Sequence, residues 1–181
     1  MALSLEKITA MKLIKEEYKQ ISTNPIANIG VSVGLPDEDN ILEWQCTLRG
    51  PTDSSYSGGL FILRIKFPTN YPQSAPEVCF QTPIYHLNIN PRKAHGESLG
   101  HVCINTLNWW KPEHKMKEVL TNIFALFYMA NPESPYGLER AEEFRKNRPL
   151  YEEKAKFFTN KYANPHSKYV PDGSDWNFSF N

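Results

Sequence analysis

Residues 42–66 read LEWQCTLRGPTDSSYSGGLFILRIK and contain two β-prone runs, Leu42–Arg49 and Leu60–Lys66. In the first run, Trp44, Cys46 and Leu48 recur at every second position, the spacing of a strand with one buried face. The glycines at the end of the connecting segment are typical of a turn. A short connection favours antiparallel pairing, because parallel neighbours need a crossover of a dozen or more residues.

Two further β-prone runs flank this pair, at Ile29–Val33 and Val78–Thr82. Gly34-Leu35-Pro36-Asp37 precedes residue 42, and the proline-rich segment 67–76 follows residue 66. Each proline removes a donor from the strand ladder, so Phe67–Pro72 is predicted to form a rigid surface loop. The sequence therefore predicts a four-stranded antiparallel meander.

Helical spacing of apolar residues surrounds this sheet. Ser4 is placed to cap an amphipathic helix that ends near Pro25, and residues 116–127 predict a central, largely buried helix. Leu138–Arg148 and Leu150–Tyr162 predict two more helices, separated by Pro149. The expected fold class is α+β, with an N-terminal helix, the meander, a central helix and two C-terminal helices.

Composition limits the domain organisation and the class of partner. The 181 residues, 40% of them hydrophobic, predict one domain at residues 1–162 and a C-terminal tail at residues 163–181. Lys plus Arg equals Asp plus Glu, so no basic excess argues for nucleic acid. No apolar run approaches the roughly 20 residues of a membrane span. Three cysteines in no metal-binding spacing, without a leader segment, favour a reducing location, cytoplasmic or nuclear.

Cys103 is the candidate nucleophile. It lies in Gly100-His101-Val102-Cys103-Ile104-Asn105, downstream of Asn88 and upstream of Trp110. From Ile84 to Glu113 no clear period is present, and a segment of that length favours a functional role over mere connection. A thiolate is suited to holding an acyl group reversibly, and a nearby amide can stabilise the oxyanion formed on attack.

The order of elements and the motifs together resemble the ubiquitin-conjugating enzyme (E2) family, whose fold is the UBC fold. The resemblance covers roughly residues 5–162. The shared motifs are Trp44, Gly50-Pro51, Tyr56-Ser57-Gly58-Gly59, Phe67-Pro68-Thr69-Asn70-Tyr71-Pro72 with Pro76, Ile84-Tyr85-His86-Leu87-Asn88-Ile89, Gly100-His101-Val102-Cys103-Ile104, Trp110-Lys111-Pro112 and Asn131-Pro132-Glu133-Ser134-Pro135.

The resemblance implies that Cys103 accepts ubiquitin or a ubiquitin-like protein as a thioester and passes it to a ligase cysteine or a substrate lysine. The expected partners are an E1 activating enzyme and an E3 ligase of the RING, HECT or RBR type. No cofactor or metal is expected, since the activating enzyme uses the ATP. The resemblance implies that Asn88 stabilises the oxyanion or holds the active-site loop in shape. It implies that His86 organises that loop by bonding to backbone groups.

Four features depart from the family pattern. Leu87 replaces the usual proline, and the stretch at residues 92–99 is an insertion of unassigned role. Asn105 and Ser134 are neutral where lysine-reactive members carry acids. Because carboxylates help to orient and deprotonate an incoming lysine, both residues weaken the case for transfer to lysine. The C-terminal pattern resembles that of members that pass ubiquitin preferentially to ligase cysteines, which implies that thiol acceptors are favoured. This pattern comprises Trp110-Lys111-Pro112, Ala141-Glu142-Glu143-Phe144 and Phe157-Phe158-Thr159-Asn160-Lys161-Tyr162.

Three other interpretations remain open at this point. Cys103 with His86 or His101 as base would make a cysteine hydrolase, although no papain-like or caspase-like signature is present. A metal site at His95, His101 and Cys103 would lack a fourth ligand and paired spacing. A weakly active or non-catalytic ubiquitin-binding scaffold of the same fold is the third.

Overall fold

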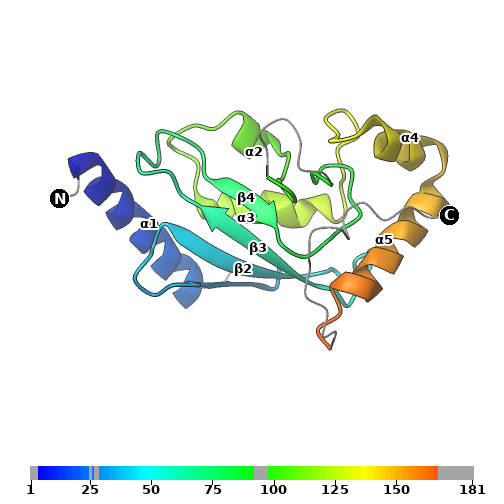
Figure 1. Ribbon diagram of the computed structural model, residues 1–181, viewed down its shortest axis with the longest axis horizontal. Helices are drawn as coiled ribbons and strands as arrows, with labels where there is room; N and C mark the ends of the chain where they lie inside the picture. Colours follow the sequence, from blue (N-terminus) through cyan, green and yellow to red (C-terminus); the bar gives the residue numbers. More distant parts are fainter. Residues whose placement is uncertain (1–3, 25, 27–28, 92–97, 167–181) are drawn as a thin grey trace.

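The computed structural model describes residues 4–24, 26, 29–91 and 98–166. Helices and strands alternate little along the chain (Figure 1). Their order is α1 (Leu5–Thr23), β1 (Val31–Gly34), β2 (Glu43–Arg49), β3 (Leu60–Lys66), β4 (Glu77–Phe80), α2 (Asn105–Asn108), α3 (Met116–Leu126), α4 (Leu138–Lys146) and α5 (Arg148–Tyr162).

The sheet is an antiparallel meander in the order β1-β2-β3-β4, as predicted. In its centre Trp44 pairs with Ile65, and both side chains are fully buried. β4 ends at Phe80, two residues earlier than the predicted Thr82. The reason is local: the Thr82 hydroxyl accepts the Ile62 N–H at 2.9 Å, so a side chain replaces the ladder at this point.

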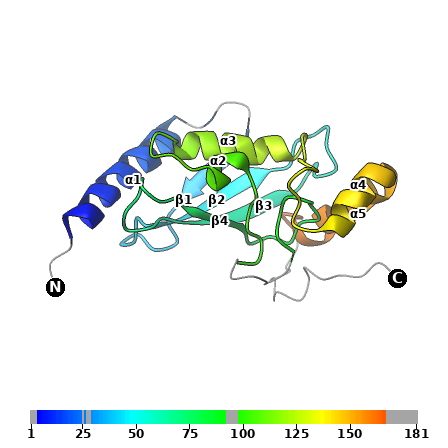
Figure 2. The same ribbon diagram turned by 90° about the horizontal axis from the view of Figure 1, so that it is seen from above.

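The two ends of the sheet carry different helices, and α3 covers one face (Figure 2). α1 lies at one end, and α4 and α5 lie at the other. The predicted central helix is confirmed, since α3 buries Met116, Val119, Leu120 and Ile123. The core therefore lies between α3 and the sheet.

α1 begins where the sequence predicted. The Ser4 hydroxyl accepts the Lys7 N–H at 3.2 Å, which caps the helix. One buried residue on this helix is polar: Glu17 accepts hydrogen bonds from the Tyr71 hydroxyl at 2.9 Å and from the Met116 N–H at 2.8 Å. This carboxylate joins α1 to the 67–72 loop and to the start of α3.

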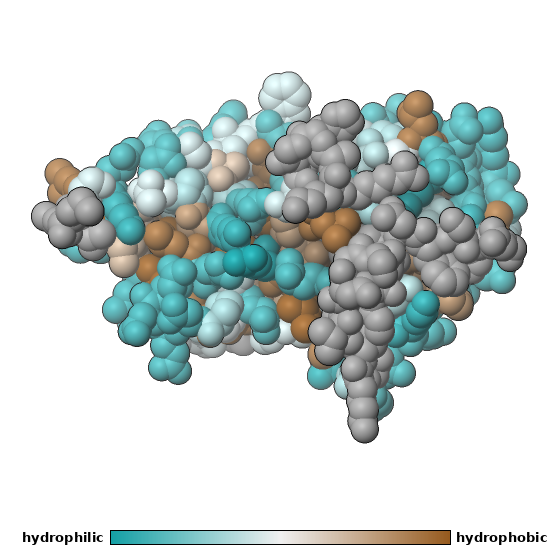
Figure 3. All heavy atoms as spheres, viewed as in Figure 1, coloured by the Kyte–Doolittle hydropathy of each residue, from teal (hydrophilic) through white to brown (hydrophobic). Residues whose placement is uncertain are grey.

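The face shown in Figure 3 is mostly hydrophilic, with hydrophobic residues visible between the polar ones. None of the helices in the described ranges combines the length and the apolar character that crossing a membrane requires.

Candidate active site

A short antiparallel pairing places Cys103. Its N–H donates to the Asn88 carbonyl at 2.9 Å, and Ile89 forms a β-bridge with Val102. At the other end of the pairing, Asn90 donates to the His101 carbonyl at 2.9 Å. Cys103 and Asn88, 15 positions apart in the sequence, therefore lie beside one another.

Gly100 fixes this pairing against the sheet. Its φ is +77°, and a Cβ on it would lie 2.0 Å from the Phe80 carbonyl oxygen. The Phe80 N–H donates to the Gly100 carbonyl at 2.8 Å, and the Val102 N–H donates to the Val78 carbonyl at 3.1 Å. Only glycine allows this close approach, which holds the cysteine segment along the edge of β4.

Asn88 is fully buried, and its side chain is bound to the backbone of the 131–134 segment. Its Nδ2 donates to the carbonyls of Asn131 at 2.8 Å and Ser134 at 2.9 Å. Its Oδ1 accepts the Asn131 N–H at 2.8 Å. Both amide protons are thus engaged in holding the 131–134 segment beside the cysteine.

His86 is also buried, and both of its ring nitrogens are bonded to backbone. Nε2 lies 3.0 Å from the Leu126 carbonyl oxygen, and Nδ1 lies 3.0 Å from the donating Asn88 nitrogen. This pattern requires the neutral tautomer with its proton on Nε2. Burial lowers the pKa of His86 to about 4, so the ring is neutral at pH 7.

Leu87 has a backbone N–H that proline would lack, and a side chain of α5 accepts its hydrogen bond. The Leu87 N–H donates to the Tyr151 hydroxyl of α5 at 3.1 Å. The Leu87 carbonyl accepts the Tyr136 N–H at 2.8 Å. Because Leu87 is fully buried, Tyr151 satisfies a donor that would otherwise be left without a partner.

Two side chains flank the Cys103 sulfur, which is partly exposed. The Ser134 hydroxyl oxygen lies 3.4 Å from Sγ, and Asn108 Nδ2 donates to Sγ at 3.2 Å. Asn105 lies at the start of α2, is exposed, and accepts the Trp109 N–H on its carbonyl at 2.8 Å. The structure therefore brings Cys103, Asn88, Ser134 and the predicted position 105 into one region.

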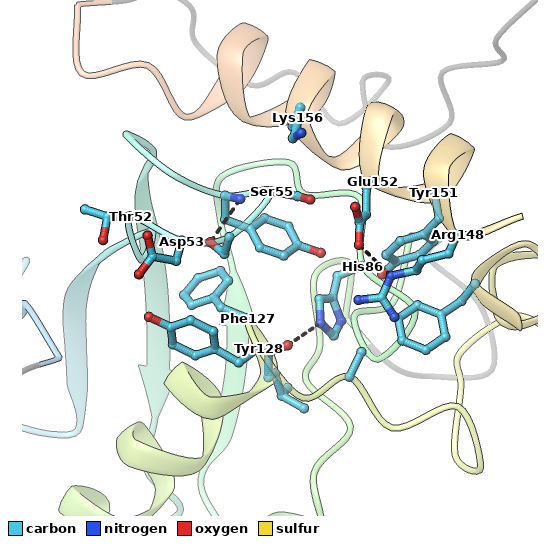
Figure 4. A pocket seen from close by; sticks show the side chains of 15 residues that line it. Thr52, Asp53, Ser55, His86, Phe127, Tyr128, Arg148, Tyr151, Glu152 and Lys156 are labelled. Carbon is cyan, nitrogen blue, oxygen red and sulfur yellow. Dashed lines mark hydrogen bonds and ion pairs between the residues drawn. The ribbon is translucent and has the colours of Figure 1, made fainter.

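Residues of α4 and α5 hydrogen-bond to the segment Tyr85–Leu87. Arg140 donates to the His86 carbonyl at 3.2 Å and stacks over the Tyr85 ring at 4.4 Å. The Tyr85 hydroxyl donates to Glu143 at 2.6 Å. Figure 4 shows His86 and Tyr151 lining a cleft on this side, between the 52–56 loop, the end of α3 and α5. Cys103 does not line this cleft.

The other cysteines are buried in the core. Burial raises the pKa of Cys46 and of Cys79 to about 12, so neither thiol is ionised at neutral pH. Within the described ranges, no three His, Cys, Asp or Glu side chains gather closely enough to hold a metal ion. His95 and most of the 92–99 insertion lie outside the described residues, as does the tail from residue 167 onward.

The histidine arrangement does not support the hydrolase interpretation. Backbone groups occupy both ring nitrogens of His86. His101 directs Nδ1 to the Tyr136 hydroxyl. A cysteine hydrolase instead needs a histidine within hydrogen-bond reach of the thiol.

Sequence reasoning missed Asn108 and Tyr151. Asn108 reaches the sulfur because α2 turns residues 105–108 back toward Cys103, and this short helix has no apolar period that reveals it. Tyr151 is 64 positions from Leu87. The proline replaced by Leu87 was a usable signal, because a buried loop N–H requires an acceptor.

Comparison with known proteins agrees with the geometry. A family profile described as "Ubiquitin-conjugating enzyme" matches residues 13–159. Over 161 residues the chain is 36% identical to "Probable ubiquitin-conjugating enzyme E2 31" of Arabidopsis thaliana. The aligned region covers 88% of this chain and 97% of that protein. These similarities do not favour either alternative, a non-catalytic scaffold or a protein that carries a ubiquitin-like modifier.

Proposed function

Since this chain belongs to the ubiquitin-conjugating enzyme family, we propose that Cys103 accepts ubiquitin from an activating enzyme as a thioester and transfers it to an acceptor. Membership of the family supports a transferase role and implies ubiquitin, an activating enzyme and a ligase as partners in general. The thioester on Cys103 is the specific part of the proposal.

One observation carries the proposal: of the three free cysteines, only Cys103 is not buried. Cys103 is partly exposed, and its sulfur is in contact with Ser134 Oγ and Asn108 Nδ2. Attack on an activated thioester exchanges one thiolate for another, so it needs an accessible sulfur and no dedicated general base. In this proposal Asn88 and His86 hold the loop, because their side chains are bound to backbone.

Incubation with activating enzyme, ubiquitin and ATP, followed by a gel without reductant, tests the thioester. The wild type is expected to form a band of added ubiquitin mass that thiol reductant removes. Cys103→Ala removes the band, and Cys103→Ser converts it to an ester that survives mild reductant. Cys79→Ala is the matched control and keeps the band. A reductant-sensitive band that persists in Cys103→Ala contradicts the proposal.

We propose further that thiol acceptors are favoured over lysine, which points to a ligase of the HECT or RBR type. Asn105 and Ser134 are neutral. The acidic neighbour Glu133 turns its carboxylate to Arg145, at 2.9 Å. No carboxylate among these three residues faces the sulfur to deprotonate an amine.

The acceptor preference is measured by discharge of the loaded protein onto N-acetylcysteine and onto Nα-acetyl-lysine. Loss to the thiol is expected to be the faster of the two. Ser134→Asp is expected to raise the rate with lysine and to leave the rate with the thiol nearly unchanged. Faster loss to lysine in the wild type contradicts the preference.

Reduced thiols set the proposed surroundings of this activity. All three cysteines are free, and Cys103 must remain a thiol to accept ubiquitin. We therefore place the protein in the cytoplasm or nucleus, where thiols are kept reduced. The chain itself needs no cofactor in this scheme, because the activating enzyme consumes the ATP.

A further inference from the structure

We propose that Asn108 is a further catalytic residue, whose side-chain amide donates to the Cys103 sulfur and stabilises negative charge on it when the thioester bond forms and breaks. The inference rests on the proposed thioester function of Cys103. It starts from one contact, the hydrogen bond from Asn108 Nδ2 to Sγ at 3.2 Å.

Asn88 is poorly available for this role in the structure. Its side chain is 0% exposed, and its two amide protons go to the Asn131 and Ser134 carbonyls. Asn108 is exposed, and its amide points at the sulfur itself. The amide placed to meet developing charge is therefore the one on α2.

The short helix α2 is anchored well enough to position this amide. The Asn108 N–H donates to the Ile104 carbonyl at 2.9 Å, and the Leu107 side chain is buried. Thr106 is also buried, and its hydroxyl accepts a hydrogen bond from Asn122 of α3. α2 is thus held to the central helix α3.

The charge that Asn108 meets follows from the bonds that change. An acceptor thiolate attacks the thioester carbonyl carbon and forms a new carbon–sulfur bond, while the carbonyl π pair moves to oxygen. When that pair returns, the bond to Cys103 Sγ breaks and its electron pair stays on Sγ. One thiolate enters and one leaves, so no net proton is transferred. Hydrogen bonds to charged groups are stronger than neutral ones, so the Asn108 contact strengthens as Sγ leaves.

Two variants separate donation from packing. Asn108→Ala removes the donor, and Asn108→Asp keeps the size but places an acceptor and a negative charge beside the sulfur. Asn160→Ala, at an exposed position of α5, is the matched control. Thermal unfolding of each variant checks the fold, and we expect a shift of less than about 2 °C for changes at these exposed positions.

The first measurement is discharge of the loaded protein onto N-acetylcysteine, which offers a thiol and no amine. Asn108→Ala is expected to discharge about 10-fold more slowly than the wild type. This loss is smaller than that for an oxyanion donor enclosed in an active site, because water competes for the exposed Asn108 amide. Asn108→Asp is expected to be slower still. The Asn160→Ala rate should equal that of the wild type.

The second measurement needs no ubiquitin. Cys103 of the unloaded protein is alkylated with iodoacetamide at pH 7, and the modified peptide is quantified by mass spectrometry. Loss of the donor removes a hydrogen bond to the sulfur that attacks iodoacetamide, so Asn108→Ala is expected to react about 3-fold more slowly. Asn108→Asp is again expected to be the slowest.

The two measurements keep the inference and the proposed function apart. A wild type that never loads ubiquitin contradicts the proposed function, while the alkylation rates still test Asn108. Equal alkylation and discharge rates in all variants overturn the role of Asn108. Slowing that comes with a large fall in unfolding temperature also overturns it, since packing then explains the loss.

Discussion

Two segments near Cys103 are built differently. Residues 86–88, here called the buried wall, are removed from solvent and bonded to backbone through the His86 ring and the Asn88 amide. Asn105 and Asn108 of α2, here called the exposed wall, are open to solvent. The side chains of His86 and Asn88, which belong to the family motif, are thus engaged by backbone, whereas Asn108 contacts the sulfur.

This difference assigns two kinds of role within one site. Polar groups of the buried wall stabilise the position of the cysteine, and breaking them leaves buried donors or acceptors without partners. In the proposal above, Asn108 of the exposed wall meets the changing charge, and side chains at exposed positions contribute little to stability. Changes in the buried wall should therefore alter folding, and changes in the exposed wall should alter rates.

The largest expected effect is that of Asn88→Ala. It removes three hydrogen bonds and leaves the Asn131 and Ser134 carbonyls without this donor, so the free energy of unfolding should fall by about 3 to 5 kcal/mol. Urea unfolding measures the loss, with Asn160→Ala as a control expected to change it by less than about 0.5 kcal/mol. An unchanged free energy together with slower discharge would assign Asn88 to the reaction instead of the loop.

Acid should weaken the buried wall through His86. Its pKa is lowered to about 4 by burial, whereas an unfolded histidine titrates near 6.5. Between these values the unfolded chain binds more protons than the native chain, so stability falls as the pH falls from about 6.5 to 4. At about pH 4 the resulting loss in the free energy of unfolding reaches about 3 kcal/mol.

Two measurements check the role of His86 in acid. Urea unfolding at pH 7 and pH 5 gives the change in the free energy of unfolding. Nuclear magnetic resonance of the imidazole proton signals shows where the ring titrates. A His86 signal that titrates near pH 6.5 would contradict a buried neutral ring.

A smaller effect is expected for Tyr151→Phe, which deprives the Leu87 N–H of its acceptor. The predicted loss is about 1 to 2 kcal/mol in the free energy of unfolding. In a Leu87→Pro background the donor is absent, so the same change should lose only about 0.5 kcal/mol. The double-mutant cycle measures this coupling by urea unfolding. Equal losses in both backgrounds would show that the Tyr151 hydroxyl stabilises the protein through a group other than the Leu87 N–H.

Local patterns predicted the meander, the central helix and the cap at Ser4, because alternation, helical spacing and capping depend on neighbouring residues. The bounds shifted where a side chain replaced a backbone partner, as Thr82 does beside Ile62. α2 was not expected, since its four residues are too few for a period to show. The structure describes residues 163–166 of the predicted tail, and the Leu60 N–H donates to the Ala163 carbonyl at 2.7 Å.

The sequence by itself determined the family and made Cys103 the candidate nucleophile, because the family motifs are contiguous and their order along the chain carries the resemblance. Only the tertiary structure decided which groups each side chain contacts. The direction of the Asn88 amide, the two backbone partners of His86, the acceptor for Leu87 and the approach of Asn108 to the sulfur depend on contacts between residues 2 to 64 positions apart. Such contacts are made by packing, which fixes where a side chain points, and no local spacing encodes that direction.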